Sequence, residues 1–184
     1  MTPACPICPA WMPAVRTLIR HRRGAAVIEF ALVAVPFFGL LFAVLTTSLA
    51  YFAQQGLESV AAAAGRSLLV GDTQAAGLSK AQFKTGVCAK LPRYMRCSNL
   101  LVSVDRSASF ATIDAATPTI SFGSGGAPID TMPYNPGAAR EIVTLRLYYV
   151  WQLPSVNLGY DISTLSGSRR LLVATSVAKT EQYS

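Results

Sequence analysis

The stretch that decides the fold is Arg22-Arg23-Gly24-Ala25-Ala26-Val27-Ile28-Glu29-Phe30, which leads into an apolar segment ending at Ala53. Residues 30–53 are 24 positions without a formal charge. As an α-helix they would span roughly 36 Å, more than the ~30 Å hydrocarbon core of a bilayer. The sequence therefore predicts a single transmembrane helix over residues 25–53.

Basic residues are concentrated on the N-terminal side of this segment. Arg16, Arg20, Arg22 and Arg23 precede it, and no acidic residue comes before Glu29. Without these four arginines the net charge falls from +7 to +3, because 12 basic and 9 acidic residues remain. Arginines hold their end of a span in the cytoplasm, so we expect the N-terminus inside and the chain beyond the span outside. The basic cluster is short and lacks interleaved aromatics, so no nucleic-acid partner is expected.

The junction before the span combines a glycine with a single acid. Gly24 ends the basic stretch, and Glu29 is the fifth residue after it. A carboxylate in a membrane costs about 2–3 kcal/mol at depth on insertion scales, so it usually has a partner or a role. Glycine lets the backbone lie extended in a protease cleft. Two plainer interpretations stay open: Glu29 as an acid reaching the membrane surface, and Gly24 as a simple helix start.

This junction resembles the cleavage region of type IV prepilins and pseudopilins. The resemblance implies that a membrane prepilin peptidase cuts between Gly24 and Ala25. It also implies that Glu29 pairs with the N-terminal amine of a neighbouring subunit, where the two charges offset one another in lipid.

The segment from Arg22 to about Tyr51, with Pro36 inside its apolar part, is similar to TadE-like proteins of the tight-adherence (Tad) pilus system. Phe30 follows the acid, as in the Tad pseudopilins, and Glu29 with Phe30 is the expected subunit-assembly site. The resemblance implies a minor pilin or pseudopilin needed to assemble a Tad (Flp, type IVb-like) pilus, with a role in cell adhesion. The chain is too long for a major Flp pilin and too short for the extra domain of the TadG-type relatives.

The expected partners are the prepilin peptidase, other pilin or pseudopilin subunits, and the inner-membrane pilus platform. The expected organisation is a basic cytoplasmic leader at 1–24, cleaved on maturation, a transmembrane helix at 25–53, and a periplasmic domain at 54–184. The protein would be a single-pass protein of the bacterial inner membrane, and its domain could also enter the fibre.

Two other interpretations compete with this one. The chain could be an uncleaved single-span protein whose outer domain binds an envelope component. It could also carry a secretory signal peptide cut near Ser48-Leu49-Ala50, although the apolar stretch exceeds the usual 7–15 residues.

The four cysteines form two pairs. Cys88 and Cys97 fall on the expected outer side, where oxidation is allowed, and predict a disulfide; two buried free thiols are the alternative. Cys5 and Cys8 form one CxxC pair, a weak signal for zinc or redox chemistry, and are read as incidental. A start at Met12 would remove them.

The outer domain predicts an α+β fold, with helical and strand patterns in succession. The helix of the span continues along Leu57, Ala61, Ala64 and Leu68 and stops at Gly71. This stripe packs either on neighbouring subunits or on its own domain. Ser79 and Gln82 form a capping box that starts a second helix, and Pro92 ends it. Alternation predicts a small antiparallel sheet whose strands lie near Leu100–Val104, Phe110–Ile113, Thr119–Phe122, Glu141–Trp151 and Arg169–Lys179.

Nothing in the sequence points to catalysis. The only histidine, His21, lies in the expected leader, so the mature chain would lack imidazole for a triad or a metal site. Gly123-Ser124-Gly125-Gly126 lacks the lysine and following helix of a phosphate-binding loop. We therefore expect a protein that is not an enzyme and has no metal or cofactor.

Overall fold

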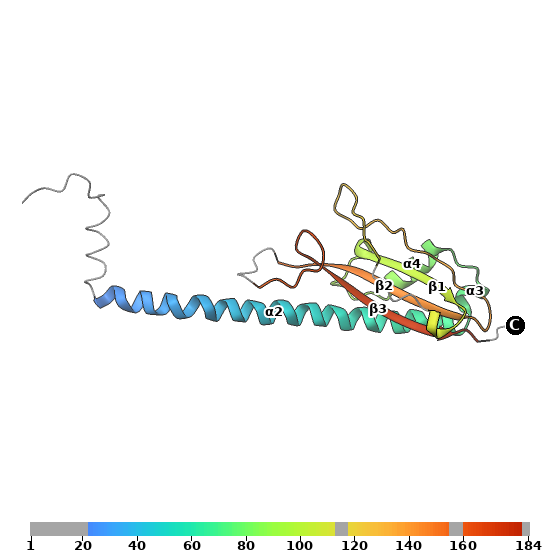
Figure 1. Ribbon diagram of the computed structural model, residues 1–184, viewed down its shortest axis with the longest axis horizontal. Helices are drawn as coiled ribbons and strands as arrows, with labels where there is room; N and C mark the ends of the chain where they lie inside the picture. Colours follow the sequence, from blue (N-terminus) through green and yellow to red (C-terminus); the bar gives the residue numbers. More distant parts are fainter. Residues whose placement is uncertain (1–21, 113–117, 155–159, 182–184) are drawn as a thin grey trace, which may run out of the picture. The chain divides into compact units, whose positions relative to one another are not determined.

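The computed structural model describes residues 22–112, 118–154 and 160–181 and divides the chain into two compact units, Met1–Leu45 and Thr46–Ser184. The leader residues Cys5, Cys8, Met12 and His21 lie outside the described residues. The elements, labelled in Figure 1, are the helices α2 (Arg22–Leu69), α3 (Asp72–Ala75) and α4 (Lys80–Ala89), the 3-10 turns η1 (Cys97–Asn99) and η2 (Phe110–Thr112), and the strands β1 (Leu100–Ser107), β2 (Ile142–Gln152) and β3 (Arg169–Lys179).

In the first unit, every described residue belongs to α2. The apolar sequence favours this helix in lipid because a helix satisfies its backbone hydrogen bonds internally. Pro36 lies inside α2 and has no N–H for the carbonyl of Leu32, yet the helix continues through it.

The second unit is built on a three-stranded sheet in the order β1-β2-β3, with both pairs antiparallel. Leu100 lies opposite Tyr149 in the first pair, and Leu145 lies opposite Ser176 in the second. The predicted α+β class is confirmed: a long apolar helix precedes a small antiparallel sheet.

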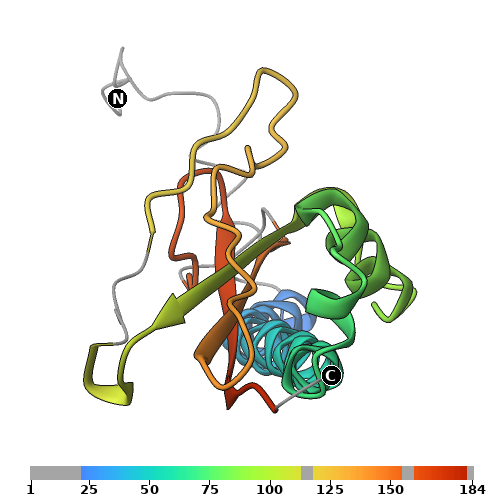
Figure 2. The same ribbon diagram turned by 90° about the vertical axis from the view of Figure 1, so that its right-hand side faces the viewer.

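The main core lies between the sheet and two helices, because α2 and α4 cover the same face (Figure 2). The stripe predicted on α2 is buried here against its own domain. Of the two packing partners left open by the sequence, neighbouring subunits or its own domain, the described fold has the second. The buried residues of α2 are Ala53, Leu57, Val60, Ala61, Ala64 and Leu68. A second, smaller cluster of Leu101, Met132 and Tyr148 lies on the opposite face of the sheet.

The predicted helix signals are confirmed in the structure. Ser79 caps α4, and Gln82 completes the capping box by accepting from the Ser79 backbone N–H at 2.9 Å. Helix α2 ends at Leu69, and Gly71 follows with a positive φ of 82°, a conformation that glycine adopts without steric cost.

Two of the predicted strands are wrong. Residues from Phe110 form the 3-10 turn η2, and Ile113 lies outside the described residues. Residues 119–122 contribute only an isolated bridge between Phe122 and Pro128. These apolar runs are short, and the neighbouring edge of β1 is instead bridged by Tyr134, so they have no strand to pair with.

Candidate assembly helix and the pocket beside it

The N-terminal part of α2 presents an apolar surface. Its side chains from Val27 to Leu45 are exposed at nearly every large apolar position within the first unit. Helix α2 is long and apolar enough to cross a membrane, with a mean hydropathy of 2.4 in its most apolar window. Because water disfavours such a surface, it requires lipid or other apolar helices as its surroundings.

The predicted processing site lies at the start of this helix. Gly24 and Ala25 have helical backbone, since α2 begins at Arg22. The helix thus begins two residues before the glycine, and the cleavage itself stays a prediction. A peptidase would have to unwind this first turn to bind it in an extended form.

Glu29 and Phe30 are exposed one turn further along α2. Glu29 has no ion-pair partner within the part of the chain that the structure describes. The next acid of the chain is Glu58, so Glu29 is the only acid in the apolar part of α2. An exposed carboxylate on an apolar helix can pair with a cation from another chain, which is the role that the resemblance to prepilins implies for it.

The second half of α2 approaches β3 closely at Gly65. An ideal Cβ placed on Gly65 would lie 2.8 Å from the Cβ of Ser176 and closer still to its hydroxyl. The absence of a side chain at Gly65 therefore sets the distance between α2 and the sheet. This close approach is made by β3 of the same domain.

The predicted disulfide is present. Cys88 and Cys97 are bonded, and their Cα atoms are 5.4 Å apart. The bond joins the end of α4 to η1, which leads directly into β1. The disulfide therefore holds α4 against β1, the edge strand of the sheet.

A salt-bridge cluster fixes the segment before β2 to α4. The Asp130 carboxylate contacts the Nζ atoms of Lys80 at 2.6 Å and Lys84 at 3.1 Å. Burial acts to raise the pKa of Asp130, but the hydrogen bonds and charges of the two lysines outweigh it and hold the pKa below its ordinary value. Nearby, burial raises the pKa of Tyr134, whose hydroxyl donates to the carbonyl of Leu78 at 2.9 Å.

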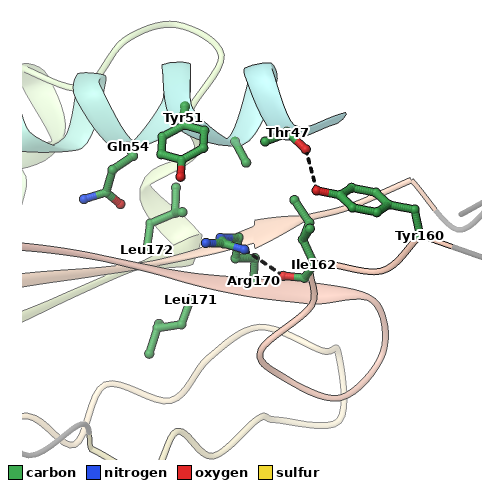
Figure 3. A pocket seen from close by; sticks show the side chains of 9 residues that line it. Thr47, Tyr51, Gln54, Tyr160, Ile162, Arg170, Leu171 and Leu172 are labelled. Atoms are coloured by element: carbon green, nitrogen blue, oxygen red, sulfur yellow. Dashed lines mark hydrogen bonds between the residues drawn. The ribbon is translucent and has the colours of Figure 1, made fainter. Parts of the chain in front are cut away.

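Beside the outer half of α2 the second unit forms a pocket of about 210 Å³ between the helix, β3 and the loop before β3 (Figure 3). Tyr51 and Arg170 point into it, and the Tyr160 hydroxyl lies 2.9 Å from the Thr47 hydroxyl at its rim. The Arg170 guanidinium donates to the carbonyl of Ile162 at 2.9 Å. The lining residues are Thr47, Ala50, Tyr51, Gln54, Tyr160, Ile162, Arg170, Leu171 and Leu172.

Sequence reasoning missed this pocket. It placed Arg170 in the strand Arg169–Lys179, and Arg170 meets Tyr51 and Tyr160 only through folding. The one available signal was the alternation of β3, which puts Arg170 on the same, helix-facing side as Leu172 and Ala174.

Comparison with known protein families gives a match over part of the chain. Residues 24–66 match the family model described as TadE-like protein. No curated protein and no solved structure matches the chain. The matched segment contains the predicted junction, the exposed part of α2 and most of its buried stripe, and it ends before Cys88 and the sheet.

Proposed function

We propose, from the match of residues 24–66 to the TadE-like family model, that the chain is a minor pilin or pseudopilin needed to assemble a Tad pilus. The observation that carries the proposal is Glu29, an exposed acid on an otherwise apolar helix, at the fifth position after Gly24 and inside the matched segment. A prepilin peptidase cuts after Gly24, and α2 then joins other pilin-type helices within the membrane.

The assembly step rests on one charge pair. Cleavage leaves a free α-amine on Ala25, and this cation meets Glu29 of a neighbouring subunit. Each charge alone is costly in lipid, so pairing favours a fixed axial register between subunits. The apolar side chains of α2 then pack against their counterparts, as helices do within a membrane.

Two features support an extracytoplasmic position for the second unit. The four arginines before the span favour a cytoplasmic N-terminus. The Cys88–Cys97 bond lies in the second unit, and disulfides persist in oxidising compartments such as the bacterial periplasm. The proposed location is therefore the inner membrane, with the sheet domain in the periplasm. We propose no catalytic role for it.

The decisive experiment is the intact mass and N-terminal sequence of the chain recovered from its native membrane. A start at Ala25 is expected, and Gly24→Leu should retain the leader and abolish piliation. An uncleaved native chain would favour the single-span envelope protein instead. A start near Tyr51 would indicate a secreted domain and overturn the proposal.

A matched pair of acids on α2 tests the assembly role. Glu29→Gln should be processed normally yet give no detectable pili, because breaking a buried ion pair costs roughly 3–5 kcal/mol. Glu58→Gln is the control, since Glu58 is exposed in the second unit and accepts a hydrogen bond from the Gln54 side chain of its own helix at 2.8 Å. Pili counted by electron microscopy should be normal in the control. Normal piliation with Glu29→Gln would contradict the pairing.

A further inference from the structure

The pocket beside α2 contains residues from the end of the uncharged segment itself. Thr47, Ala50 and Tyr51 line it, and all three belong to residues 30–53. At 1.5 Å per residue, about 20 residues cross a ~30 Å hydrocarbon core. The predicted span, residues 25–53, exceeds this length and ends two residues after Tyr51, which puts the pocket at the outer end of the span, at the depth of the lipid headgroups.

The polar chemistry of the pocket suits a phosphate. Arg170 supplies the only formal charge among the lining residues, and none of them is acidic. A guanidinium has five N–H donors in a planar fork, and the bond to Ile162 uses one end of it, which orients the rest. Tyr51 and Tyr160 are 65 % and 43 % exposed, and their hydroxyls add donors at the rim.

Aromatic side chains cluster at this end of the domain. Phe52, which is 60 % exposed, stacks on Tyr94 with ring centroids 5.1 Å apart, and Tyr94 meets Trp151 at 6.4 Å. Trp151 lies opposite Arg170 in the β2–β3 register. Tyrosine and tryptophan are enriched where membrane proteins meet the headgroup layer, because their rings are apolar and their polar atoms stay wet.

We propose that this pocket binds the phosphate of a phospholipid headgroup from the leaflet that the span enters last, with Arg170 on the phosphate and the aromatic cluster in the interface around it. The bound lipid fixes the height of the sheet domain above the membrane. The inference rests on the proposed membrane anchoring but not on cleavage or pilus assembly.

Trp151 provides a built-in reporter for the test. The chain has two tryptophans, so full-length protein carrying Trp11→Phe reports only on Trp151. The fluorescence of this protein in neutral detergent is titrated with short-chain phosphatidylglycerol, with a diacylglycerol of the same chains, and with free glycerol phosphate. We expect a saturable change with phosphatidylglycerol, none with the diacylglycerol, and half-saturation by glycerol phosphate only at concentrations at least about tenfold higher. Equal effects of the two lipids, or equal affinity for free glycerol phosphate, would overturn a lipid-phosphate site.

Arg170→Gln should weaken phosphatidylglycerol binding by about tenfold or more, because it removes a charge-assisted contact. Arg93→Gln is the control, since Arg93 is exposed and does not line the pocket. Tyr160→Phe removes one hydroxyl without changing charge and should weaken binding by about threefold, which tests the site even if Arg170→Gln fails to fold. Unchanged affinity in the folded variants would sink the proposal. Alkaline extraction of membranes separately reports whether the chain is inserted at all, so failure of anchoring is distinguished from failure of the site.

Discussion

Gly65 shows how one absent side chain positions a helix. It lies in the buried part of α2, directly against Ser176 of β3. Rotating the Ser176 hydroxyl would not make room for a Cβ, because the Ser176 Cβ is itself only 2.8 Å from the ideal position. Relief would require the helix or the strand to move.

Gly65→Ala should therefore destabilise the domain, although alanine in a helix interior is favoured over glycine by about 1 kcal/mol. Overpacking of this kind costs roughly 1–3 kcal/mol, so the loss should outweigh the propensity gain. Gly86→Ala in α4 is the matched control, since nothing lies within 4 Å of its ideal Cβ, and it should be neutral or stabilising. Ser176→Gly added to Gly65→Ala should restore much of the loss in thermal unfolding. A stable Gly65→Ala single variant would show that α2 and β3 can separate freely.

At the scale of elements, α4 is held from two sides. The Cys88–Cys97 bond fixes its C-terminal end to the start of β1. Asp130 fixes its N-terminal half to the segment before β2 through Lys80 and Lys84. The Lys80 Nζ also donates to the carbonyl of Met132 at 2.6 Å, which extends the link to the second core cluster.

Asp130→Asn should lower the free energy of unfolding near neutral pH by about 1–2 kcal/mol, as expected for loss of a partly buried, charge-assisted link. The pKa of Asp130 is lowered in the folded state, so its contribution is present above its unfolded pKa, near 4, and is lost as the pH falls through the lower folded value. The gap between wild type and variant should therefore be constant above about pH 5 and close at lower pH. Asp105→Asn, at an exposed position of β1, is the control. Denaturant unfolding at several pH values measures the gap, and a gap that is unchanged at low pH would exclude Asp130 as its source.

Elements with a strong local signal could be predicted from the sequence. The helix cap at Ser79, the stop at Gly71 and the strand Ile142–Gln152 follow from residues next to each other in the chain. The failed strands near Phe110 and Thr119 had adequate patterns but no partner, and pairing depends on the rest of the sheet.

The candidate sites divide in the same way. Gly24, Ala25, Glu29 and Phe30 are recognisable because they lie within seven consecutive positions. The pocket joins Tyr51 to Arg170 across more than a hundred residues, and only the packing of α2 on β3 brings them together. No local sequence pattern predicts that these two residues lie close together.

At the scale of the whole molecule, α2 serves both units. Its residues up to Leu45 form the described part of the first unit, and its later residues supply one side of the main core of the second. That core is complete within the second unit, since all of its members follow Thr46. The first unit and the main core therefore share one helix but not the same residues.

A chain trimmed to residues 46–184 should fold without a membrane, form the Cys88–Cys97 bond and unfold cooperatively. A chain trimmed to 71–184 should not, because it loses Leu57, Val60 and Leu68 together with the buried alanines of α2. Emptying each large core position costs about 2–5 kcal/mol. The total for three positions is comparable to the whole free energy of unfolding of a typical domain, about 5–15 kcal/mol. Circular dichroism, thermal unfolding and free-thiol titration would compare the two chains. Cooperative unfolding of the shorter chain would mean that the sheet and α4 suffice as a core, and α2 would then be an anchor that merely rests on a domain already folded without it.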